Sequence, residues 1–176
     1  MDTIEHNGLT FRVTKEHDHD AGAPWEREDG HGPVSDWTTR GKFPGELVIN
    51  KDRGRFRYYD FAEACRIARR DGWGARGTGE SEVSPRAIAA QAAREDFEHL
   101  KAWCDDRWSY IGVVVTLLDI EGNETDAVQS LWGIADDGSF AEQVAQEQVE
   151  QCADEAVDMI ADGVYISGAR TWRVTA

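Results

Sequence analysis

The chain has 176 residues, of which 34 are acidic and 19 basic, giving a formal net charge of −15. An apolar content of 40% with seven tryptophans excludes a chain that is disordered throughout. The longest apolar run, Ile111 to Val115, is far shorter than the roughly 20 residues that cross a bilayer, and the start Met1-Asp2-Thr3 does not have the pattern expected of a signal peptide. We therefore expect a cytoplasmic protein without membrane contact, whose partners carry basic surfaces rather than being nucleic acid itself.

The first segment with regular periodicity runs from Leu9 to Val13. Apolar and polar residues alternate there, which predicts a strand with one buried face. Residues 15–45 lose this pattern and are rich in glycine and proline, so a long loop is predicted. Loops of this length are often functional.

A hairpin is predicted next, from Glu46 to Asn50 and from Arg55 to Tyr59, with Gly54 in its turn. A helix is then predicted from Asp60, because Asp60 and Glu63 form a capping-box-like start, and Gly72 ends it.

Residues 72–84 form a predicted glycine-rich connection. Its start, residues 72–77, satisfies G-x-G-x-x-G, but it follows a helix rather than a strand, which argues against a dinucleotide site. Ser84 followed by Pro85 then predicts the start of a helix that reaches about Asp105.

A long strand from Trp108 to Ile120 is apolar on both faces, which predicts a central position in the sheet. Residues 121–123 turn the chain into a second hairpin that runs to Ile134. A last helix is predicted from Phe140 to about Asp162, and Val164 to Val174 has the composition of a returning strand. Together these elements predict one α+β domain over residues 1–176, with an antiparallel or mixed sheet of about five strands covered by two or three helices.

The negative charge is concentrated in the last third of the chain. From Trp108 onward there are 13 acidic residues and only two basic ones, Arg170 and Arg173. On a helical wheel, one side of the last helix carries carboxylates and the other carries apolar side chains. The predicted partner-binding residues on this acidic stripe are Glu147, Glu150, Asp154, Asp158 and Asp162. Like charges one turn apart destabilise a helix slightly, so the stripe is not explained by helix stability.

Residues 53–79 show the opposite bias in charge. They contain seven arginines but only three acidic residues up to Asp71, namely Asp60, Glu63 and Asp71. This segment could contact nucleic acid, or it could pair with the acidic helix within the fold or across a homodimer. The sequence leaves these alternatives open.

Chemistry-bearing motifs are scarce. The three cysteines are widely spaced and indicate neither a disulfide framework nor a metal knuckle, and no nucleophile elbow occurs, so no catalytic residue is assigned and no cofactor is expected. His17, His19 and His31 lie among aspartates, and the alternative to a binding protein is a metal-dependent enzyme centred on these histidines.

The segment from Gly22 to Trp37 is the most distinctive part of the sequence. Trp25 and Trp37 lie there among glycines and prolines, so they either anchor the loop on the domain or form a partner-binding surface of the kind found at interface hot spots.

This segment, GAPWEREDGHGPVSDW, together with the RFRYYDFAEA helix start and the RRDGW helix end, resembles a group of small proteins of tailed phages and prophages. The resemblance covers about residues 9–135 and implies an accessory role during infection. The acidic charge is similar to that of anti-restriction and anti-CRISPR inhibitors, some of which mimic DNA. The function we expect is therefore a non-enzymatic inhibitor that binds a host protein with a basic surface, with a phage structural or assembly component as a further alternative.

Overall fold

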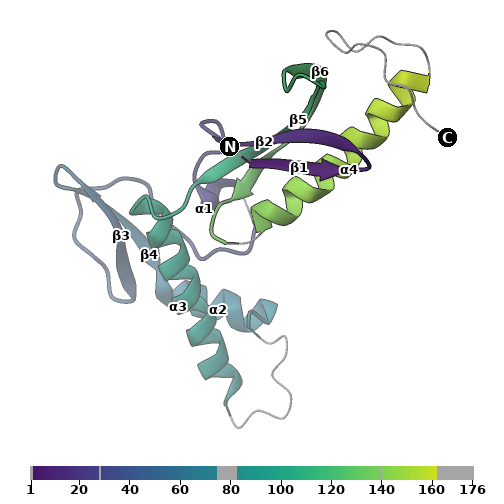
Figure 1. The fold of residues 1–176 in the computed structure, drawn as a ribbon. Helices are drawn as coiled ribbons and strands as arrows, with labels where there is room; N and C mark the ends of the chain where they lie inside the picture. The colour runs from purple at the N-terminus through teal and green to yellow at the C-terminus, as the bar shows by residue number, and fades with distance from the viewer. Residues whose placement is uncertain (1, 28, 75–82, 139, 162–176) are drawn as a thin grey trace. The chain divides into compact units, whose positions relative to one another are not determined.

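The computed structural model describes residues 2–27, 29–74, 83–138 and 140–161, with side chains up to residue 154 in the last range (Figure 1). The α+β class is confirmed, since the described residues form six strands in two antiparallel sheets and four helices. The chain divides into two compact units, which we call the acidic unit (Met1–Ala21 and Trp108–Ala176) and the inserted unit (Gly22–Arg107). Among the described residues, no helix is apolar over a sufficient length to span a membrane.

The acidic unit contains a four-stranded antiparallel sheet in the order β1-β2-β5-β6. Its strands are β1 (Asp2–His6), β2 (Leu9–His17), β5 (Tyr110–Leu118) and β6 (Glu124–Ala135). The predicted central strand is confirmed, because β5 pairs with β2 on one side and β6 on the other. Strand β1 was not predicted. It forms a hairpin with β2 through Asn7 and Gly8, which both have positive φ, as a type I′ hairpin turn requires.

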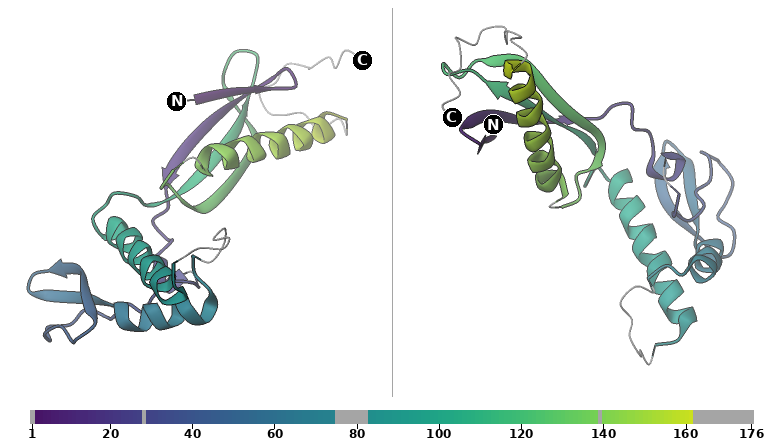
Figure 2. Two further views of the ribbon diagram at one scale, coloured as in Figure 1. Left: turned by 90° about the horizontal axis from the view of Figure 1, so that it is seen from below. Right: turned by 90° about the vertical axis from the view of Figure 1, so that its right-hand side faces the viewer.

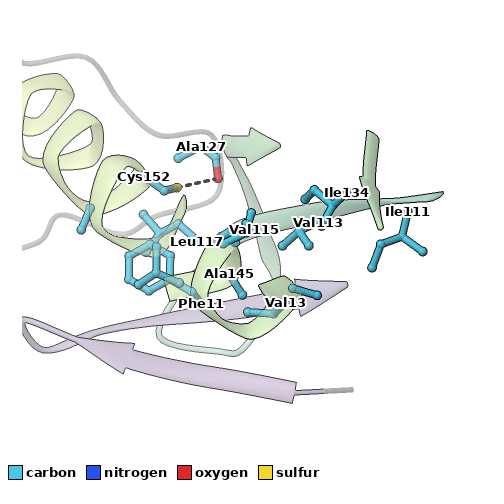
Figure 3. Packing of buried hydrophobic residues seen from close by; sticks show 14 residues of the cluster. Phe11, Val13, Ile111, Val113, Val115, Leu117, Ala127, Ile134, Ala145 and Cys152 are labelled. Carbon is cyan, nitrogen blue, oxygen red and sulfur yellow. Dashed lines mark hydrogen bonds between the residues drawn. The ribbon is translucent and has the colours of Figure 1, made fainter. Parts of the chain in front are cut away.

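Helix α4 (Phe140–Ala161) packs along one face of this sheet (Figure 2). Alternate residues of β2 and β5 point toward it, among them Phe11, Val113 and Leu117, which have no exposed surface. The helix contributes Val144, Val149 and Cys152 to the same core, and the Cys152 thiol lies 3.6 Å from the Ala127 carbonyl of β6 (Figure 3). The predicted apolar side of α4 is confirmed at Ala145, Val149 and Cys152; the side chains of Ala156 and Ile160 lie outside the described residues.

In its described residues, 22–27, 29–74 and 83–107, the inserted unit forms a two-stranded sheet and three helices. Its elements are α1 (Pro24–Arg27), β3 (Glu46–Asp52), β4 (Arg55–Asp60), α2 (Phe61–Asp71) and α3 (Pro85–Cys104). Both predicted helix starts are confirmed, since Asp60 accepts a hydrogen bond from the Glu63 amide at 2.9 Å and Ser84 accepts one from Ala87 at 3.3 Å. Gly72 ends α2, as predicted, and the structure shows it in the left-handed conformation.

Residues 15–45 are more ordered than the predicted loop. Strand β2 continues to His17, α1 forms a single helical turn, and Val34 and Thr38 make isolated bridges to Tyr59 and Phe56 of β4. The strand predicted from Val164 to Val174 lies outside the described residues, as does most of the predicted glycine-rich connection over residues 72–84.

Candidate functional site

The division into units separates the charge of the protein. The acidic unit contains 18 acidic and 4 basic residues, a net charge of −14. The inserted unit contains 16 acidic and 15 basic residues, a net charge of −1. Nearly the whole charge excess of the chain therefore belongs to one unit.

The outer face of α4 carries carboxylates. Glu142, Glu147, Glu150 and Asp154 are exposed, whereas Val144 and its neighbours on the inner face are buried. Among the described residues, none of these four carboxylates forms an ion pair, and Glu147 accepts a hydrogen bond only from the Gln143 amide, at 3.0 Å. Of the predicted stripe, the side chain of Asp158 and the whole of Asp162 lie outside the described residues.

The basic residues of the acidic unit that the structure describes, Arg12 and Lys15, do not neutralise this face. Arg12 pairs with Glu124 of β6 at 2.7 Å, and Lys15 lies 4.0 Å from Asp136. The acidic face of α4, defined by Glu142, Glu147, Glu150 and Asp154, thus offers carboxylates that no described cation of its own unit satisfies.

Trp25 and Trp37, the other predicted partner-binding residues, are half-buried in the inserted unit and surround an arginine. The Arg57 guanidinium lies 5.2 Å from the Trp25 ring centre and 4.9 Å from that of Trp37, within range of cation–π attraction. Trp25 also meets Trp103 of α3 edge to face, at 5.4 Å. These contacts give both tryptophans a packing role, and their contact with a partner stays a prediction.

Arg57 itself was not singled out from the sequence. Its Nε–H is buried and has no hydrogen-bond partner in the described part of the chain, and its guanidinium lies between the two tryptophan rings and close enough to the thiol of Cys104 to influence it. The pKa of that thiol is raised mainly by burial, which outweighs the opposing charge of Arg57.

A second cluster in the inserted unit is built on Asp96 of α3. One oxygen of its carboxylate lies 2.6 Å from His31 Nδ1, and the other accepts hydrogen bonds from the Gly32 amide at 2.8 Å and the Tyr59 hydroxyl at 2.7 Å. Tyr59 is fully buried, and burial is the main reason why its pKa is raised, with Asp96 adding to the shift. Asp96 therefore fastens the loop before β3 onto α3 and β4.

The three histidines of the metal-site alternative are divided between the units. His17 and His19 belong to the acidic unit, where their rings lie 4.5 Å apart, whereas His31 belongs to the inserted unit and is engaged by Asp96. Over the residues that the structure describes, no three His, Cys, Asp or Glu side chains are grouped as metal ligands would be.

Two features that the sequence analysis missed differ in whether the sequence indicates them. Asp96 lies on a predicted helix, and nothing in the sequence around it indicates that it is the partner of His31. The Asn7–Gly8 pair, by contrast, is a recognised hairpin signal that could have located β1.

Comparison with known proteins adds no relative to this description: no family model, no curated protein and no solved structure matches the chain.

Proposed function

We propose that this protein is a non-enzymatic binding protein that engages a basic surface of a protein partner through the acidic face of α4. The observation that carries the proposal is the charge of the acidic unit, which contains 18 acidic and 4 basic residues. The exposed carboxylates of α4 also have no cationic partner among the described residues. Like charges one turn apart cost a helix a few tenths of a kcal/mol each, so helix stability does not explain them, which favours a role in binding.

The partner we propose is a host protein that handles nucleic acid or defends the cell, and the protein would act as a phage-encoded inhibitor of the anti-restriction or anti-CRISPR kind. Glu147, Glu150 and Asp154 rise along the helix axis by about 4.5 and 6 Å, at 1.5 Å per residue. This spacing is of the same order as that of phosphates along a nucleic-acid strand. A groove that binds phosphates could therefore accept this row of carboxylates, with long-range attraction that weakens as salt is added.

The test compares two charge-matched variants in capture of partners from a lysate of the bacterial host. The first changes Glu147→Gln, Glu150→Gln and Asp154→Asn on α4. The control changes Glu5→Gln, Glu16→Gln and Glu121→Gln, which are exposed carboxylates of the same unit away from α4. Circular dichroism is recorded for both variants to check that they are folded.

We expect the wild type and the control to recover the same partner, and the α4 variant to lose it by about tenfold or more, as removal of interfacial charges predicts. Recovery should also fall as salt rises from about 50 to 300 mM, because screening shortens the range of the attraction. Equal recovery by both variants would show that the acidic face of α4 is only a solvated surface.

A further inference from the structure

A groove lies between α2 and α3 of the inserted unit and has a volume of about 500 Å³. Its floor includes Phe61, Cys65 and Ala89, and its rim is formed by arginines of both helices: Arg66, Arg69 and Arg86. No acidic residue is among the described residues that line it. The groove thus combines an apolar floor with a cationic rim.

The rim arginines are largely free of anionic partners. Arg66 forms an exposed ion pair with Glu63 at 2.7 Å, but Arg69 and Arg86 form no ion pair with any described residue. A fourth arginine, Arg94, stacks over the ring of Phe61 at 4.6 Å. An excess of positive charge is therefore held around this groove, although the protein as a whole is strongly acidic.

The thiol of Cys65 reports the charge inside the groove. Burial raises its pKa, while Arg94 and Arg86 act in the opposite direction. The guanidinium groups of Arg86 and Arg94 therefore lie near the Cys65 thiol.

We propose that this groove binds a small anionic ligand of nucleotide size that carries phosphate groups. Arginine is suited to phosphate because its planar fork donates two parallel hydrogen bonds, and several guanidinium groups favour a multiply charged ligand over a single carboxylate. The volume falls within the roughly 300–1,000 Å³ of small-molecule sites, and Phe61 and Ala89 give the groove an apolar lining beside its arginines. The site does not depend on the acidic face of α4.

Ligand binding in the groove can be measured through the reactivity of the Cys65 thiol, which lines it. The rate at which iodoacetamide alkylates Cys65 in the full-length protein is followed by peptide mass spectrometry, with ATP, pyrophosphate, citrate, a single-stranded oligonucleotide or sodium chloride present at equal ionic strength. We expect ATP to slow alkylation about fivefold and saturably, with a Kd between about 10 μM and 1 mM, and pyrophosphate to protect more weakly. Isothermal titration with ATP measures the same binding without a chemical label.

Two triple variants with equal change of charge locate the site. Arg66→Gln, Arg69→Gln and Arg86→Gln should weaken ATP binding at least tenfold, whereas Arg53→Gln, Arg55→Gln and Arg107→Gln, at exposed positions outside the groove, should leave it unchanged. Should the groove variant lose its helical circular-dichroism signal, Arg69→Gln alone replaces it.

Three results would overturn the proposal. One is the absence of saturable protection and of titration heat up to about 10 mM ATP. Another is equal protection by citrate, which would leave no preference for phosphate. The third is protection by the oligonucleotide alone, which would assign the groove to nucleic acid rather than to a small ligand.

Discussion

Replacing Asp96 with alanine should destabilise the inserted unit by about 2–4 kcal/mol, because the carboxylate is the acceptor for three separate groups. The Gly32 amide is buried and would lose its acceptor, at a cost of roughly 1–3 kcal/mol. Tyr59 would keep an acceptor, since its hydroxyl also lies 3.1 Å from the Ala93 carbonyl, and the partly exposed ring of His31 could reach water. The expected loss therefore comes from one buried donor left without an acceptor, the Gly32 amide, and from weaker hydrogen bonding of Tyr59 and His31.

The assay is urea unfolding at pH 7 followed by tryptophan fluorescence and circular dichroism, with Asp96→Asn and Glu98→Ala as companions. The asparagine retains one carbonyl oxygen that can accept from both Gly32 and Tyr59, so we expect a loss of about 1 kcal/mol or less. Glu98 is exposed on the same helix and its replacement should change the free energy of unfolding by no more than about 0.5 kcal/mol. The reasoning fails if Asp96→Ala matches Glu98→Ala, or if asparagine is as harmful as alanine.

Two more predictions concern the inserted unit. Gly32→Ala should cost about 1–3 kcal/mol, because the new Cβ would lie 2.5 Å from the buried ring of Tyr59, whereas Gly41→Ala, which has open space around it, should be neutral in the same unfolding assay. The hydrogen bonds from Arg40 hold the pKa of Glu46 below its usual 4.5, so this carboxylate stabilises the fold above that pH and the benefit is lost as pH falls. Glu46→Gln should accordingly lower the urea midpoint more at pH 7 than at pH 3, and an equal difference at both values would contradict the ion-pair explanation.

Local signals in the sequence predicted the elements well. The Asp60 and Ser84 caps, the end of α2 at Gly72 and the central position of β5 each depend on residues close in the chain, and each is confirmed. The amphipathic pattern of α4 likewise predicted the burial of Ala145, Val149 and Cys152. Such features are accessible because their energetics are set within one or two turns of backbone.

The features that were missed depend on long-range contacts. Arg57 is placed against Trp25 and Trp37 by the pairing of Val34 and Thr38 with β4, which no local pattern reveals. Asp96 is 65 residues from His31 in the chain. The division of the strands into two sheets has the same origin, since it depends on which hairpins pair with one another rather than on the strength of any strand signal.

The insertion between β2 and β5 has a consequence for synthesis. His17 pairs with Ile111 across the sheet, so 93 residues separate the last residue of one strand from the first pairing position of its neighbour. At about 5–20 residues per second, the ribosome would deliver β5 roughly 5–20 seconds after β2. During that interval Phe11 and Val13, which are buried in the finished protein, have neither β5 nor α4 to cover them. An inserted unit that folds promptly would shorten the effective loop and bring β2 to its partner sooner, because the entropy of closing a loop decreases with the length of flexible chain in it.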